Sequence, residues 1–97
     1  MKAYELLSSP EKWTTEVAAR NKDNEQVTVD SPEACKFCIY GAIRKCYGEP
    51  ESIPKEVILN LQKVMDKFNF SSTNELFKWN DSSIYEEVVS VLKELEI

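Results

Sequence analysis

The segment from Asp30 to Gly48 constrains the fold most, because residues typical of helix boundaries stand at both of its ends. Asp30 or Ser31 can cap the first turn, Pro32 suits the first helical position, and Gly48 can adopt the left-handed conformation that ends a helix. The apolar positions between them recur at three- and four-residue intervals, namely Cys35, Cys38, Ile39, Ala42, Ile43 and Cys46. The sequence therefore predicts a central helix, and Gly41 beside Ala42 predicts that a partner packs directly against its backbone.

Two later segments also have helical periodicity. The helix predicted from Pro54 to Phe68 ends at Asn69, a residue that tolerates the left-handed conformation, and Ser52 is a plausible cap before it. Its apolar stripe is Val57, Ile58, Leu61, Val64, Met65 and Phe68. The last helix is predicted from Ser83 to Leu95, with Ser83 and Glu86 at capping-box spacing and a stripe of Ile84, Val88, Val91, Leu92 and Leu95. Shorter helices are predicted for Lys2 to Ser8 and after Ser72, where Glu75 again stands at capping-box spacing.

Residues 14 to 29 differ from these helices, because Val27 and Val29 alternate with polar neighbours after a polar block. This pattern predicts a small β-hairpin, with a loop as the alternative. The whole chain has 97 residues, which is enough for one domain and one core. We therefore expect a single α+β domain over 1–97 that is mostly helical, with the central helix packed by two or three further helices and the hairpin at one side.

Charge and composition exclude several classes of function. With 17 acidic and 12 basic residues the net charge is -5, which repels a phosphate backbone or an anionic membrane, so neither nucleic acid nor membrane is an expected partner. The first residues do not resemble a signal peptide, and no stretch reaches the roughly 18 apolar residues of a membrane span. The expected location is the cytoplasm.

The chain has no histidine and three cysteines. The missing imidazole excludes Cys-His and Ser-His-Asp catalysis and any zinc site that needs a histidine. On a common helix Cys46 would lie about 12 Å from Cys38, too far for one zinc ion to bind both thiols with Cys35. We expect reduced, buried structural thiols and neither a metal nor a cofactor.

The tripeptide Trp79-Asn80-Asp81 has the composition of a turn. Asn and Asp side chains bond the backbone just ahead of them, so we expect a tryptophan anchor followed by a turn in which Asp81 caps the last helix. The alternative is that Asn80 and Asp81 are recognition groups beside a thiol or a pocket.

Three features together resemble a known family: Trp13 before the polar, hairpin-like stretch, the run Phe37-Cys38-Ile39-Tyr40-Gly41-Ala42-Ile43, and Trp79-Asn80-Asp81 before Glu86-Glu87-Val88. They resemble a small family of bacterial, actinobacterial, cyanobacterial and phage proteins of unknown function with a C-x-x-G-A helix and a later W-N-D turn. The resemblance runs from about Leu6 to Leu95 and implies no established activity. It nominates six positions, which are Cys38, Gly41, Ala42, Trp79, Asn80 and Asp81. The sequence departs from the family in a shorter Asp81 to Val88 segment and in the additional Cys35 and Cys46.

Three hypotheses of function follow. The first is a non-enzymatic protein-binding module, associated with a phage or mobile element, that docks an acidic surface on a protein partner. The second is a thiol-dependent enzyme or small-ligand-binding protein that uses Cys38 with Asn80 and Asp81 as its candidate site residues. The third is a subunit of a structural homodimer, with Tyr40 or Phe70 as an exposed anchor.

Overall fold

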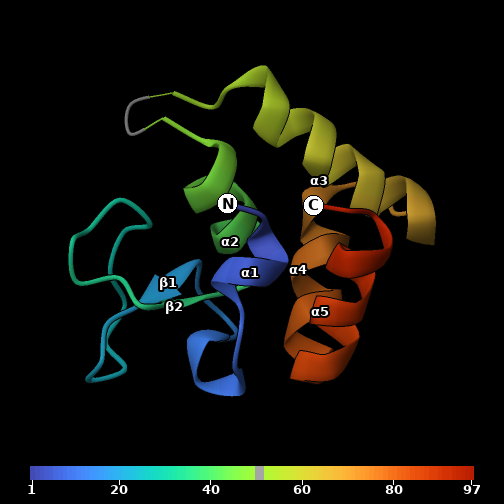
Figure 1. Ribbon diagram of the computed structural model, residues 1–97. Helices are drawn as coiled ribbons and strands as arrows, with labels where there is room; N and C mark the ends of the chain where they lie inside the picture. Colours follow the sequence, from blue (N-terminus) through green and yellow to red (C-terminus); the bar gives the residue numbers. More distant parts are fainter. Residues whose placement is uncertain (50–51) are drawn as a thin grey trace.

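The computed structural model describes residues 1–49 and 52–97, and its α3, α4 and α5 helices gather on the side opposite a very small β-sheet (Figure 1). In chain order the elements are α1 (Ala3–Leu6), the 3-10 turn η1 (Pro10–Lys12), β1 (Ala19–Arg20), β2 (Lys36–Phe37), α2 (Ile39–Tyr47), α3 (Lys55–Phe68), α4 (Thr73–Ser82) and α5 (Tyr85–Glu94). The predicted class, a mostly helical α+β fold, is confirmed. No helix in the described ranges is long and apolar enough to cross a membrane.

Helix α2 is central, as predicted, and lies between the sheet and α3 (Figure 1). It packs against α1 and α3 and, over a smaller area, against α4. Its fully buried side chains Ile39, Ala42 and Ile43 join a core to which every helix contributes. The last helix was expected on α2, but its main helix contact is with α1.

The start of α2 differs from the prediction. Lys36 and Phe37 form β2, whose antiparallel pairing sets Ala19 opposite Phe37 and Arg20 opposite Lys36. Because these two residues are extended, the helix starts at Ile39 with Cys38 as its N-cap. The predicted start at Pro32 is wrong, and Ser31 instead accepts a local hydrogen bond from the amide of Glu33 (3.2 Å).

Helix α2 ends where the sequence predicted, but the backbone conformation of its terminating residue differs from the expected one. Gly48 follows the last helical residue with an extended backbone at φ −96°, so the expected left-handed conformation is wrong there. An added Cβ at Gly48 would lie 2.4 Å from the carbonyl oxygen of Arg44, which accepts the Gly48 amide hydrogen bond. Glycine is needed at this position for space rather than for its backbone angle.

The β element is a two-stranded antiparallel sheet, but its second strand lies outside the predicted span of residues 14 to 29. Within that span a tight turn follows β1, where the Asn21 amide donates to the Glu25 carbonyl (2.9 Å) and the Val27 amide donates to that of Ala19 (3.1 Å). Val27 and Val29 are not in a strand, and Val29 is nevertheless buried in the core.

Helix α3 has the predicted end, because Asn69 adopts the left-handed conformation at φ 58°. Pro54 is its N-cap, so the prediction of Ser52 as the cap is wrong. The sequence also predicts a linker before this helix, of which Pro50 and Glu51 lie outside the described residues. The apolar stripe is also narrower than predicted: Ile58 is 54% exposed, whereas Asn60 is buried.

Helix α4 continues through Trp79, Asn80 and Asp81, so the predicted turn is wrong. The N-cap of the next helix is Ile84, which is 57% exposed, and the Ser83 hydroxyl donates backward to the Trp79 carbonyl (2.6 Å) instead of capping α5. The capping box expected at Ser72 is also absent, because Glu75 accepts from the amide of Ser71 (2.8 Å).

Candidate functional site

Asn80 joins three segments that are distant in the sequence. Its side chain is fully buried, and its Oδ1 accepts hydrogen bonds from the Trp13 indole nitrogen (3.0 Å) and from the Ile39 amide (3.0 Å). Its Nδ2 donates to the Thr14 carbonyl (3.3 Å). The Ile39 amide is in the first turn of α2, where no intrahelical acceptor exists, so Asn80 caps that helix from outside. Both polar atoms of Asn80 are used to hold the fold together.

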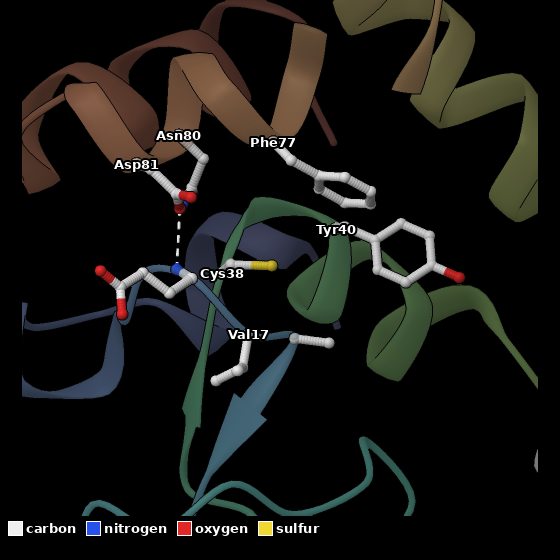
Figure 2. A pocket seen from close by; sticks show the side chains of 8 residues that line it. Val17, Cys38, Tyr40, Phe77, Asn80 and Asp81 are labelled. Atoms are coloured by element: carbon white, nitrogen blue, oxygen red, sulfur yellow. Dashed lines mark hydrogen bonds between the residues drawn. The ribbon is translucent and has the colours of Figure 1, made fainter. Parts of the chain in front are cut away.

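Asp81 lies one residue further along α4 and is exposed. Its Oδ1 accepts the backbone amide of Glu16 at 2.8 Å, the bond drawn as a dashed line in Figure 2. Glu16 has φ 72°, in the left-handed region that a non-glycine residue adopts only when its surroundings hold it there. The Asp81 carboxylate is one such restraint, and this role differs from the helix cap that the sequence predicted.

Cys38 is the N-cap of α2 and is only 4% exposed. Its Sγ accepts the amide of Gly41 at 3.4 Å, so the thiol substitutes for the usual capping hydroxyl or carboxamide. Burial raises the pKa of the Cys38 thiol, and the hydrogen bonds from the Gly41 and Tyr40 amides oppose that shift only in part. The side chain is therefore a neutral thiol near neutral pH.

A cavity of about 240 Å³, which we call the thiol pocket, opens between these groups (Figure 2). Its lining residues are Glu16, Val17, Ala18, Cys38, Tyr40, Phe77, Asn80 and Asp81. Tyr40 and Phe77 close one side with their rings edge to face, 5.4 Å apart between centroids. The structure thus brings together the three residues that the sequence nominated for a thiol site, which are Cys38, Asn80 and Asp81.

The other nominated positions have structural surroundings. A Cβ on Gly41 would lie 2.0 Å from the Ala18 carbonyl oxygen, which also accepts the Cys38 amide at 3.2 Å. The predicted close packing at Gly41 is therefore present, with the backbone of Ala18, the residue before β1, as the partner. Ala42 is buried in the core, and the Trp79 ring packs at a tilt against that of Phe68 (4.9 Å between centroids, 36° between planes) outside the thiol pocket.

The prediction that all three cysteines are buried thiols on one helix is wrong for Cys35. Cys35 is exposed ahead of β2, whereas Cys46 is half-buried near the end of α2, where burial raises the pKa of its thiol. All three are free thiols. In the part of the chain that the structure describes, no three acidic or cysteine side chains meet in a group able to hold a metal ion.

A larger groove of about 550 Å³ lies beside the thiol pocket, between α3 and α4, and we call it the α3–α4 groove. It is lined by Tyr40, Ile53, Ile58, Leu61, Gln62, Met65, Thr73 and Phe77. Ile53 and Ile58 are each 54% exposed and Phe77 is 36% exposed. Tyr40 and Phe77 line both the groove and the thiol pocket, so the two hollows are neighbours.

Sequence reasoning missed four of the lining residues, Glu16, Val17, Ala18 and Phe77, and it named Tyr40 only as an anchor of a homodimer. One signal was available for Phe77, because it precedes Asn80 by three residues and Asp81 by four, which is one helical face if α4 continues through them. No sequence signal marks Glu16 or Val17, which enter the site through the fold of the irregular segment before β1.

The chain matches a protein-family model over nearly its whole length. Residues 1–96 match the model of a family of unknown function, DUF6197. Comparisons with curated proteins and with solved structures find no significant match. Because the family match spans nearly the whole chain, the protein belongs to the DUF6197 family of unknown function.

Proposed function

We propose that the protein is a non-enzymatic protein-binding module whose α3–α4 groove receives the apolar face of an amphipathic helix from a partner. The exposure of Ile53, Ile58 and Phe77 along that groove is the observation that carries the proposal. Large aliphatic side chains that are more than half exposed and line one hollow are typical of interaction surfaces. A groove between two helices with an apolar floor suits a helix whose anchors recur every three or four residues.

The polar residues of the groove support the same partner chemistry. Gln62 and Thr73 are its two polar lining residues, and both are exposed. An apolar centre with polar groups at its edge is the usual arrangement of a protein interface. The amphipathic helix would place its apolar side chains against Ile58 and Met65 and its polar face toward solvent.

The chemistry of the thiol pocket supports binding over catalysis. A nucleophilic cysteine requires a lowered pKa and some exposure, whereas burial raises the pKa of Cys38. The Oδ1 of Asn80 already accepts from Trp13 and Ile39, and its Nδ2 already donates to Thr14 and Asp81, so a substrate would have to displace one of these bonds. These features fit a thiol and an amide that maintain the shape of a recognition surface.

The test uses a displayed library of random helical peptides selected on the purified protein. We expect binders whose affinity falls about tenfold or more in Ile58→Glu and in Phe77→Glu, because a charge in the centre of an apolar groove removes the main anchors. Ile84→Glu is the matched control, since Ile84 is equally exposed at the start of α5 but does not line the groove. Circular dichroism of each variant checks that the fold is retained. Selection without a groove-dependent binder, or an equal loss in Ile84→Glu, would contradict the proposal.

A second candidate function, a thiol-dependent enzyme or a small-ligand site, is favoured by one observation: Cys38 lines the thiol pocket beside Asp81. Iodoacetamide labelling of the native protein, followed by peptide mass mapping, separates the two candidates. We expect Cys38 to react much more slowly than Cys35, because Cys38 is buried and Cys35 is exposed. Labelling of Cys38 at the rate of Cys35 or faster would favour the thiol function.

We further infer from the net charge of -5 that neither nucleic acids nor membranes are partners. From the sequence we also infer that the protein acts in the cytoplasm and is associated with a phage or mobile element. Gel-shift and vesicle-sedimentation assays test the first inference. Binding to either at physiological salt would contradict it.

A further inference from the structure

We propose that the thiol pocket receives an arginine side chain from the same partner and that Asp81 pairs with its guanidinium group. This inference rests on the proposed function, because the arginine would belong to the segment seated in the α3–α4 groove. Nothing in the family match assigns a ligand to this pocket.

The size of the pocket indicates a single side chain. Its volume of about 240 Å³ is below the roughly 300 to 1,000 Å³ of typical small-molecule sites. Val17, Ala18 and the rings of Tyr40 and Phe77 supply apolar walls. A long side chain with an aliphatic stem and a polar end can pack its stem on such walls and keep its end at the rim.

The charges at the pocket select a cation. Asp81 and Glu16 are the charged lining residues, and both are acidic. The Glu16 amide (2.8 Å) and the Asn80 Nδ2 (3.4 Å) both donate to Oδ1 of Asp81, which fixes the carboxylate. Among the residues that the structure describes, no hydrogen bond uses Asp81 Oδ2. A carboxylate that is fixed through one oxygen presents the other to an incoming donor.

Glu16 adds negative charge at the rim of the pocket, and its carboxylate is only weakly paired with a cation of this chain. Its nearest cation is the guanidinium of Arg20, and the 3.9 Å between Arg20 Nη2 and Glu16 Oε2 is long for an ion pair with a largely exposed acid. Arg20 is held mainly by Thr14, whose Oγ1 accepts its Nε–H at 3.0 Å, and by the Asn24 carbonyl (2.9 Å). An exposed pair at that distance contributes little, so a closer cation from a partner can compete for Glu16.

Arginine fits this environment better than lysine. Its planar guanidinium can lie against an aromatic ring and donate two parallel hydrogen bonds to a carboxylate, whereas the lysine ammonium is a compact and strongly hydrated charge. The pocket has rings on one side, from Tyr40 and Phe77, and the Asp81 carboxylate on another (Figure 2).

The position of the two rings links the pocket to the groove. Because Tyr40 and Phe77 line both hollows, a segment seated in the α3–α4 groove passes directly beside the opening of the thiol pocket. The expected partner segment therefore has apolar anchors for the groove followed or preceded by an arginine.

The experiment titrates N-acetyl-arginine-N-methylamide into ¹⁵N-labelled protein at low salt and follows the backbone amides of Glu16 and Gly41 by NMR. We expect saturable shifts of both amides with the arginine probe, weaker shifts with the lysine analogue, and none with the neutral citrulline analogue. Asp81→Asn should weaken binding about fivefold, the range of a partly exposed ion pair. The variant keeps an oxygen that can accept the Glu16 amide, so the fold is retained.

Asp66→Asn is the matched control, because it makes the same change of charge at an exposed site on α3 outside the pocket. It should bind the probe like the parent protein. Absence of saturable shifts, equal binding of citrulline or lysine analogues, or equal weakening in both variants would overturn the inference. Since the probe does not occupy the groove, its failure would leave the peptide-library result standing. Conversely, a failed selection with a positive titration would reject the groove alone.

Discussion

Gly41 has no room for a side chain, because an added Cβ would lie 2.0 Å from the backbone oxygen of Ala18. We predict that Gly41→Ala destabilises the protein by about 1 to 3 kcal/mol and that Gly41→Leu costs more, since both force α2 away from the segment before β1. A glycine in an open helical position would behave in the opposite way, with alanine stabilising by about 0.5 to 1 kcal/mol. Urea denaturation measures both changes.

The control for Gly41 is Lys45→Ala, an exposed position of the same helix, where the change should stay within about 0.5 kcal/mol. If Gly41→Ala unfolds at the same or a higher urea concentration than the parent protein, the contact with Ala18 is not tight in solution.

Asn80 is the second residue whose hydrogen bonds explain why this side chain is needed at its position. We predict that Asn80→Ala costs about 2 kcal/mol or more, because the buried Ile39 amide and the partly buried Trp13 indole lose their acceptor, and an unsatisfied buried donor costs about 1 to 3 kcal/mol. Asp81→Ala should cost less, since it removes an exposed hydrogen bond to Glu16 and not a cap of α5. Thermal and urea unfolding of the two variants, with Asn74→Ala as the exposed control on α4, rank these effects. Equal losses in all three would show that Asn80 does not tie the segments together.

At the scale of single elements, sequence reasoning succeeded where the signals were local. The α3 helix was predicted to within one residue, because its apolar spacing and the terminator Asn69 act within the helix itself. The start of α2 was wrong because Ser31 and Pro32 carry helix-start signals, while the pairing of Lys36 with Arg20 comes from a distant strand. Helix and strand propensities are weak indicators of structure, and pairing with a distant strand overrides them.

The extension of α4 through Asn80 has a similar cause. Asparagine favours turns because its side chain competes for nearby backbone groups. In this structure the Asn80 side chain bonds Trp13, Thr14 and Ile39 instead, so that competition is removed and the helix continues. None of those partners is recognisable from the local sequence.

The capping thiol of α2 makes stability depend on pH. Burial raises the pKa of Cys38 in the folded state above the value of about 8.5 of an unfolded thiol. Between these two values the unfolded chain has lost the proton and the folded chain keeps it, so the free energy of unfolding should fall as the pH rises above about 8.5. Cys46, Tyr47 and Tyr85, whose pKa values burial also raises, add to the fall at higher pH.

Urea titrations at a series of alkaline pH values compare the parent protein with Cys38→Ser, whose hydroxyl can still accept the Gly41 amide but does not ionise in this range. We expect a shallower decline in the variant than in the parent. Identical slopes for the two proteins would mean that the Cys38 thiol is not desolvated.

At the scale of the whole molecule, the sequence predicted a single core and nominated the residues of the site, but it did not predict the contacts that those residues make. Cys38, Asn80 and Asp81 were identified, and the structure places all three at one pocket. Their roles differ from those expected, because the roles depend on Trp13 and on the backbone of Glu16, which approach from the other end of the chain. The groove was missed because Ile58 has the periodicity of a core residue, and only the packing of α3 on α2 leaves it exposed.

The oligomeric state tests the proposed function at this same scale, because the exposed side chains of the groove could instead pair two copies of the chain. We predict that the protein sediments as a monomer, because a net charge of -5 on each copy makes two copies repel each other. Analytical ultracentrifugation over a wide range of protein concentration measures this directly. A dimer that persists on dilution and dissociates in Ile58→Glu but not in Ile84→Glu would show that the groove is a homodimer interface, and the partner helix would then have to be a second copy of the chain.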